Sequence, residues 1–285
     1  MKYFTFVLTK EEQINIKELY RDYTKPFDNE NVSFFAIKGE IELTLYKTGK
    51  LLLKGLHLRN EISLIKSSLG RKDYAAIGSD EVGTGDVFGP VTVCAAYVSL
   101  EDIEFLEELN VRDTKSVSDA FVIKTAPLIA KRLTHSLIIL KPNQYNALVD
   151  EGYNLNKIKA HLHNQAIVSL TDKLKTNQIP VILDQFCQPN LYFNYLKDEL
   201  LVYRDISFHT KAENVHISVA AAAIIARYAF LYSLQQCSKN VNLKLLKGAT
   251  KLVDEQIEDI LEGQGLKKLL SVSKKNFKNI TKLNL

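Results

Sequence analysis

From residue 74 onward, short apolar segments alternate with longer amphipathic ones, and this alternation constrains the fold more than any other feature of the sequence. PVILD, residues 180–184, is apolar until its last residue, as in a central strand buried on both faces. The alternation is typical of an α/β domain, a sheet flanked by helices. Strands are expected at 74–79, 91–98, 136–141, 180–185 and 204–210, and helices at 118–133, 155–175, 218–236 and 250–262.

The first 70 residues follow a different pattern. A strand at 3–8 precedes a Thr-x-x-Glu capping box, Thr9 with Glu12, which starts a helix. From Val32 the apolar residues recur with period two, which predicts strands joined by a hairpin turn at 47–50. A helix at 60–69 closes the segment. The order predicts a small α+β domain over residues 1–68, with residues 69–285 forming the second domain.

Composition limits the class of protein and the cellular compartment to be expected. The 285 residues are 46% hydrophobic, which is ample for a core, and no run of about 18 uncharged apolar residues predicts a membrane span. The three cysteines lie far apart without metal-ligand spacing, which favours a reduced, cytoplasmic protein. Residues 266–285 carry six lysines and no acid, which suggests a polyanionic partner, although a solvated lysine-rich terminus is equally consistent.

Four carboxylates stand out by position. Asp80 and Glu81 follow an apolar strand, Asp184 ends another, and Glu213 lies just before an alanine-rich helix. Strand ends from distant parts of a sequence meet at one edge of an α/β sheet. A cluster of oxygen ligands without paired His or Cys favours Mg²⁺ or Mn²⁺ over zinc, and such ions serve attack on a phosphodiester. Taken singly, each acid is also consistent with solvated surface or a helix cap.

A glycine-rich stretch follows the paired acids. Its spacing, Gly83-x-Gly85-x-x-x-Gly89, is one residue too long for a dinucleotide-binding loop, and the acids would face the pyrophosphate. We therefore reject a dinucleotide site. Glycine also permits close backbone approach, so the N–H groups around Gly83, Thr84 and Gly85 are expected to contact a sugar–phosphate chain.

Together these segments resemble a known family. GSDEVGTGDVFGP, VRDTKSVSD, NLNKIKAHLHNQAI, VILDQF, HTKAENVHISVAAAAIIARYAF and LLKGAT…SKKNFKNI are similar, in order, to the sequence blocks of ribonuclease HIII, one of the type 2 ribonucleases H. Residues 1–66, notably TLYKTGKLLLKG, resemble that family's N-terminal domain, which is like half of a TATA-box-binding protein. The resemblance implies a ribonuclease H-like mixed sheet flanked by helices, behind a small α+β domain.

The resemblance also implies an activity. Members of the family cut the RNA strand of RNA–DNA hybrids without sequence specificity and leave 5′-phosphate and 3′-hydroxyl ends. The family's metal cluster falls on Asp80, Glu81, Asp184 and Glu213, which would hold two Mg²⁺ or Mn²⁺ ions. Glu213 and Thr84 match ribonuclease HIII rather than HII. Asn276 departs from the family, which often has His at that position.

Contacts to nucleic acid are expected at several further residues. Lys211 and Lys157 are candidates for phosphate contacts. Tyr46, Lys47 and Lys50, at or beside the hairpin, are candidates for backbone and sugar contacts, although an ordinary exposed hairpin explains them equally well.

The histidines are expected to have other roles. His163 is interpreted as structural, and His209 and His216 are not expected to shuttle protons, because a lone histidine is more often packed or solvated.

Two alternatives remain open. One is incision at single ribonucleotides in DNA, as in ribonuclease HII, and the other is a non-catalytic nucleic-acid-binding protein. The main hypothesis is a monomeric enzyme that acts on RNA–DNA hybrids, without a small-molecule cofactor or membrane attachment.

Overall fold

The chain forms two compact units. A computed structural model describes residues 1–71, 73–111, 117–176 and 178–283. The first unit comprises residues 1–74 with 100–113, and the second comprises 75–99 with 114–285. Residues 112–116, within the VRDTKSVSD block, lie outside the described residues.

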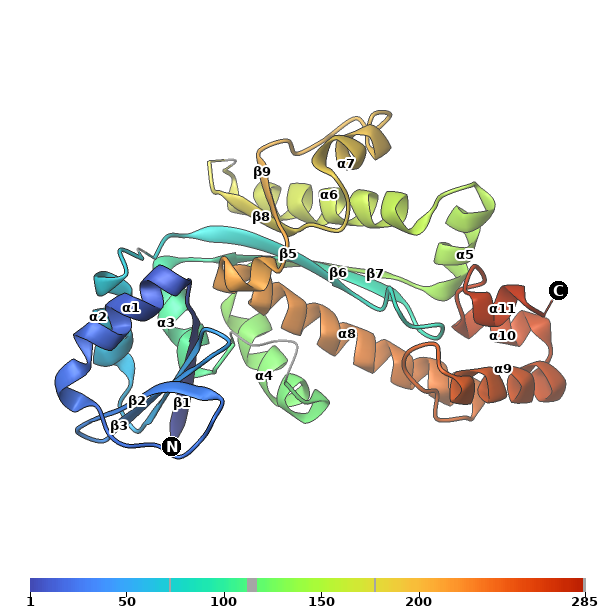
Figure 1. Cartoon of the computed structure of the whole chain (residues 1–285). Coiled ribbons are helices and arrows are strands. Elements are labelled where there is room, and N and C mark those ends of the chain that lie inside the picture. The colour runs from blue at the N-terminus through green and yellow to red at the C-terminus, as the bar shows by residue number, and fades with distance from the viewer. Residues whose placement is uncertain (72, 112–116, 177, 284–285) are drawn as a thin grey trace. The chain divides into compact units, whose positions relative to one another are not determined.

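The first unit is a small antiparallel sheet covered on one face by helices (Figure 1). Its strands lie in the order β1-β4-β3-β2, and alternate residues such as Leu43, Leu45 and Leu53 are buried beneath the helices. The predicted capping box is present, since Thr9 and Glu12 each accept a hydrogen bond from the other's backbone N–H. The elements are β1 (Lys2–Val7), α1 (Lys10–Leu19), η1 (Arg21–Tyr23), β2 (Val32–Lys38), β3 (Ile41–Tyr46), β4 (Lys50–Gly55), α2 (Arg59–Ser68) and α3 (Leu100–Glu108).

The second unit is a mixed five-stranded sheet between helices, which confirms the predicted fold class. Its strands lie in the order β7-β6-β5-β8-β9; β8 runs parallel to its neighbours β5 and β9, while β6 is antiparallel to β5 and β7. The elements are β5 (Ala76–Val82), β6 (Val91–Val98), α4 (Asp119–Arg132), β7 (His135–Leu140), α5 (Pro142–Asp150), α6 (Leu155–Leu174), β8 (Val181–Asp184), α7 (Pro189–Tyr195), β9 (Ile206–His209), η2 (Ala212–Asn214), α8 (Ile217–Val241), α9 (Lys251–Gln264), α10 (Leu266–Val272) and α11 (Lys278–Thr281).

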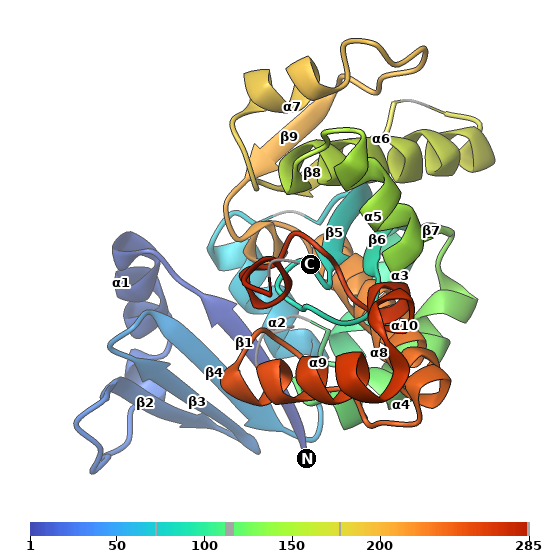
Figure 2. The same cartoon turned by 90° about the vertical axis from the view of Figure 1, so that its right-hand side faces the viewer.

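Helices α6 and α8 cover opposite faces of this sheet (Figures 1 and 2). On the α6 face, Ile77 packs with Ile158 and Leu162. On the α8 face, the helix lies so close to β5 that a Cβ on Gly78 would sit 2.2 Å from the backbone nitrogen of Val219. The absence of a side chain at Gly78 permits this approach.

Most element boundaries differ by a few residues from the sequence prediction, and two of these differences concern segments next to the predicted acids. Strand β5 continues to Val82, because its pairing with β6 extends to Thr92, so Asp80 and Glu81 are strand residues and do not follow the strand. Helix α8 begins at Ile217, one residue before the predicted start, and is capped by His216, whose side chain accepts from the N–H of Ser218.

Helix α8 is also long and apolar enough to cross a membrane by length and composition alone. However, 72% of its most apolar stretch is buried within the fold, as expected for the central helix of a packed domain. The same test finds no second candidate among the described residues.

Candidate active site

Three elements of the second unit bring the four predicted carboxylates to one pocket. Asp80 lies near the end of β5, and Asp184 ends β8, the parallel neighbour of β5. The Oδ1 of Asp184 accepts a hydrogen bond of 2.9 Å from the backbone N–H of Ala212, which fixes the short helix η2 that carries Glu213. All four acids line a cavity of about 330 Å³. Strand pairing and one side chain-to-backbone hydrogen bond therefore position acids that are far apart in the sequence.

Asp80 and Glu81 point to opposite faces of the sheet, because successive strand residues alternate. Asp80 shares the α8 face with Gly78, and Glu81 shares the α6 face with Ser79. Burial, followed by the negative charge of Glu81, raises the pKa of Asp80 well above its usual value; Asp184 and Glu213 add to the effect. The backbone N–H of Glu81, which donates to Asp80 over 2.8 Å, opposes the shift only in part. A cation would relieve this repulsion.

Glu81 is held by two residues from one face of α6. Lys159 donates to Oε1 over 3.0 Å, and the Nε2 of His163 lies 2.9 Å from Oε2. Burial alone would raise the pKa of Glu81, but His163 and Lys159 outweigh it and lower that pKa to about 2. The other ring nitrogen of His163 is 2.7 Å from the hydroxyl of Ser79.

His163 was expected to be structural, and Lys159 was not among the predicted site residues. Their spacing, one turn apart on a helix predicted to cover the sheet, was the available signal.

The donor chemistry of the pocket fits a divalent ion. Asp80, Asp184 and Glu213 offer only oxygen atoms, the ligands preferred by Mg²⁺ and Mn²⁺. As they stand, no three His, Cys, Asp or Glu side chains among the described residues converge closely enough to hold an ion. Glu81 is in addition hydrogen-bonded to Lys159 and His163 of α6. The assignment of these acids as metal ligands therefore stays a prediction.

The glycine loop after β5 has a fixed base and an exposed tip. Gly83 has a φ of +95°, and a Cβ there would lie 2.2 Å from the carbonyl oxygen of Pro90, so glycine is required by packing. Gly85 is exposed, and a Cβ there would meet nothing within 4 Å. The backbone N–H groups of Thr84 and Gly85 donate to no described residue. They remain available to a ligand that approaches the tip.

The other predicted nucleic-acid residues are partly accounted for by local contacts. Lys211 is exposed, with a φ of +57°, immediately before η2 and hence near Glu213 in sequence. Lys157, in the first turn of α6, has its Nζ 3.7 Å from the ring centroid of Tyr153. His216 is occupied as the helix cap.

In the first unit, Tyr46 and Lys50 lie on the sheet face opposite the core, and Lys47 lies in the turn between their strands. On the same face Lys54 pairs with Glu42. This face therefore offers aromatic and basic side chains, and its role in binding stays a prediction.

The lysine-rich terminus has fewer side chains available to a polyanionic partner than its charge suggests. Lys274 is completely buried, and Lys275 and Lys282 pair with Asp150 and Asp254. Asn276, the departure from the family pattern, accepts a hydrogen bond of 3.1 Å from the hydroxyl of Tyr145. These residues therefore have structural partners within the second unit.

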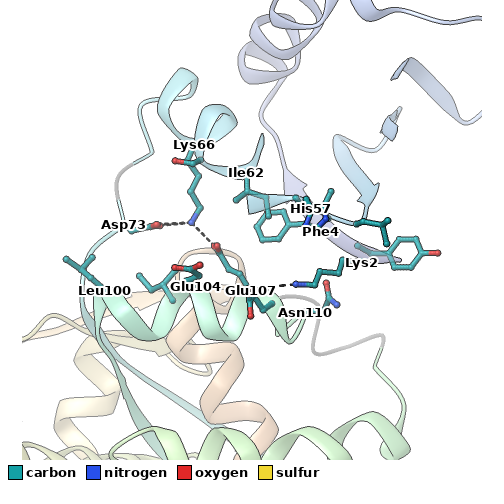
Figure 3. A pocket seen from close by; sticks show the side chains of 16 residues that line it. Lys2, Phe4, His57, Ile62, Lys66, Asp73, Leu100, Glu104, Glu107 and Asn110 are labelled. Carbon is teal, nitrogen blue, oxygen red and sulfur yellow. Dashed lines mark hydrogen bonds and ion pairs between the residues drawn. The ribbon is translucent and has the colours of Figure 1, made fainter. Parts of the chain in front are cut away.

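A further cavity of about 410 Å³ lies within the first unit (Figure 3). Lys66 crosses it and bonds to Asp73 over 2.8 Å and to Glu107 over 2.6 Å, which ties α2 to α3. Phe4 and Ile62 form part of its apolar lining. None of the predicted site residues lines this cavity, so the ion pairs are read as structural.

Comparisons with known proteins show the family of the chain. A family model described as Ribonuclease HII matches residues 77–280. Ribonuclease HIII of Phytoplasma mali (strain AT) is 47% identical over 284 residues, which are 99% of this chain and 98% of that protein. Ribonuclease HIII of Bacillus pumilus (strain SAFR-032) is 38% identical over 84% of this chain and 85% of that protein. The crystal structure of Bst-RNase HIII in complex with Mn²⁺ matches with a TM-score of 0.75 and 33% identity, over 99% of this chain and 97% of that one.

The fold and these matches define the class, a type 2 ribonuclease H. Within it, the chain belongs to the ribonuclease HIII family. It is therefore a metal-dependent endoribonuclease that acts on the RNA strand of RNA–DNA hybrids. The expected class, fold and activity are confirmed, while the roles of individual residues stay predictions.

Proposed function

We propose that this enzyme hydrolyses the RNA strand through two divalent ions, Mg²⁺ or Mn²⁺, held by Asp80, Glu81, Asp184 and Glu213. The observation that carries the proposal is the pocket itself, in which two parallel strand ends and η2 present only oxygen donors. When bound, such ions activate water and stabilise the leaving 3′-oxygen, which yields 5′-phosphate and 3′-hydroxyl ends.

The protein contributes to this chemistry the orientation and the charge of its carboxylates. Asp80 and Asp184 offer carboxylates from adjacent strands, and the hydrogen bond from Ala212 to Asp184 holds η2, whose Glu213 lines the same pocket. His163 and Lys159 keep Glu81 ionised in a buried setting, so that its remaining lone pairs are available without prior loss of a proton.

Recognition of RNA is proposed to come from the glycine loop. The 2′-hydroxyl is the group that distinguishes RNA from DNA at a given site. The available N–H groups of Thr84 and Gly85 are suited to bind it, and backbone groups do not depend on base identity. Cleavage without sequence specificity follows.

Further contacts are proposed along the hybrid backbone. Lys211 and Lys157 would bind phosphates near the site, and Tyr46, Lys47 and Lys50 would bind from the open sheet face of the first unit. We further propose a monomeric, cytoplasmic enzyme that needs no small-molecule cofactor.

The decisive experiment compares three labelled duplexes, each with Mg²⁺, with Mn²⁺ and with EDTA: an RNA–DNA hybrid, a DNA duplex with one ribonucleotide, and plain DNA. Metal-dependent cutting of the hybrid alone is expected. Equal incision at the single ribonucleotide would instead indicate specificity of the ribonuclease HII type. Asp184→Asn is expected to bind the hybrid but not cut it; a fully active variant would contradict the assigned ligand.

A further inference from the structure

Lys274 is the one lysine with no exposed surface among the described residues, and both of its ends bind the glycine loop. Its Nζ donates to the backbone carbonyl of Asp86 over 2.7 Å, and its own backbone N–H donates to the carbonyl of Val87 over 2.9 Å. Burial lowers the pKa of Lys274 to about 7, although the nearby Asp86 carboxylate opposes this. A buried amine is costly unless it is hydrogen-bonded, and the carbonyl of Asp86 in the loop supplies this hydrogen bond.

The two residues before Lys274 also contact the glycine loop. Ser273 forms a bridge with Phe88, and the N–H of Gly89 donates to the carbonyl of Val272 over 2.9 Å. The 272–274 segment therefore runs along the C-terminal half of the loop and pairs with three consecutive parts of it.

The loop is held from a second direction by the residue Gly248. Its N–H donates to the Oδ1 of Asp86 over 2.6 Å, and its carbonyl accepts from the N–H of Val87 over 3.0 Å. Asp86 thus binds Lys274 through its backbone and Gly248 through its side chain. The base of the loop is fixed on two sides, whereas Gly85 at the tip is exposed.

We propose that Lys274 is a positioning residue for RNA recognition: it holds the base of the 83–89 loop so that the N–H groups of Thr84 and Gly85 are presented to 2′-hydroxyl groups. This inference rests on the proposed function of the loop. It adds Lys274 to the residues that take part in RNA recognition, although this lysine lies almost 190 positions from Asp86 in the sequence. Preorganised donors bind more tightly than mobile ones because less conformational entropy is lost.

The test compares Lys274→Met, which keeps the length of the side chain and removes the donor, with Lys274→Arg, which keeps a donor. Lys267→Met serves as the matched control, because Lys267 is an exposed lysine of the same C-terminal segment. Affinities for an RNA–DNA hybrid and for a DNA duplex of equal sequence are measured with Ca²⁺ in place of Mg²⁺. The kcat and KM with Mg²⁺ and the Mn²⁺ affinity by electron paramagnetic resonance are measured on the same proteins.

Lys274→Met is expected to lower the preference for hybrid over DNA about tenfold, the effect of losing about one hydrogen bond, and to raise KM more than it lowers kcat. Its Mn²⁺ affinity should stay within about twofold of the wild type, because no proposed metal ligand is touched. Lys274→Arg should restore most of the preference, and Lys267→Met should match the wild type. A purely structural role would reduce the active fraction without changing the preference.

An unchanged preference in folded Lys274→Met would overturn the inference, as would equal losses of affinity for hybrid and DNA. If Lys274→Met does not fold, Asp86→Ala tests the same loop from its other anchor, and an unchanged preference in that variant is equally decisive. A wild type with no preference for hybrid would instead overturn the proposed function. The two failures are therefore distinguishable.

Discussion

Two of the three glycines of the loop, Gly83 and Gly85, predict different effects of the same substitution. Gly83→Ala places a methyl group 2.2 Å from the carbonyl oxygen of Pro90 and 2.9 Å from the ring of Phe230, at a φ of +95°. The backbone strain costs roughly 1–2 kcal/mol and the overpacking roughly 1–3 kcal/mol. Together they should lower the free energy of unfolding by about 2–5 kcal/mol.

Gly85→Ala places its methyl group in open space at the exposed tip. Its free energy of unfolding should therefore stay within about 0.5 kcal/mol of the wild type. If the tip approaches the sugar–phosphate chain, however, the methyl group should raise KM for the hybrid about tenfold.

Urea denaturation and steady-state cleavage, measured on both variants and the wild type, separate the two effects. If Gly85→Ala is as destabilising as Gly83→Ala, the assignment of Gly85 to an open tip is wrong. If Gly85→Ala cleaves the hybrid with an unchanged KM, the approach of the tip to the sugar–phosphate chain is wrong.

Three further outcomes concern buried charges. Between pH 7 and pH 9 the unfolded chain keeps the proton of Lys274 while the folded chain loses it. The free energy of unfolding of the wild type should therefore rise by roughly 2 kcal/mol relative to that of Lys274→Met over this range. Urea denaturation at each pH measures the difference. Lys159→Met removes the cation beside Glu81 and should cost roughly 3 kcal/mol by the same method; an unchanged stability would show that the pair is not buried as described. Glu61→Gln weakens the acceptor that Lys38 contacts over 2.8 Å and should cost roughly 1–3 kcal/mol, visible as a lower Tm.

Much of the fold could be predicted from periodicity. The period-two pattern from Val32 gave the small sheet, and the apolar segments gave the five strands of the second unit. The short helices α5 and α7 were missed, although each begins with proline, because seven to nine residues hold too few periodic positions. The end of β5 was missed because Asp and Glu are depleted in strands, and pairing with β6 overrides that preference here. The place of α3 in the first unit depends on contacts that chain order does not reveal.

The candidate site was predicted where local signals existed. Asp80 and Asp184 follow apolar runs, and the structure brings both to one pocket. The partners of Glu81 could not be derived, because they depend on which face of α6 meets the sheet. The same is true of Lys274, whose sequence neighbours suggest a solvated terminus and whose burial follows only from the packing of distant segments.

The close contacts of α8 also fix the length of the site. The helix meets β5 at Gly78 through Val219 and meets the loop at Gly83 through Phe230. Five residues of strand and eleven residues of helix each span about 16 Å, and eleven residues complete about three helical turns, so both contacts fall on one side of α8. Inserting one residue into α8 between them would turn Phe230 about 100° away from the loop. The distance between the acidic pocket and the loop is therefore the same along strand β5 and along helix α8. A change in the length of either element alone would break one of the two contacts.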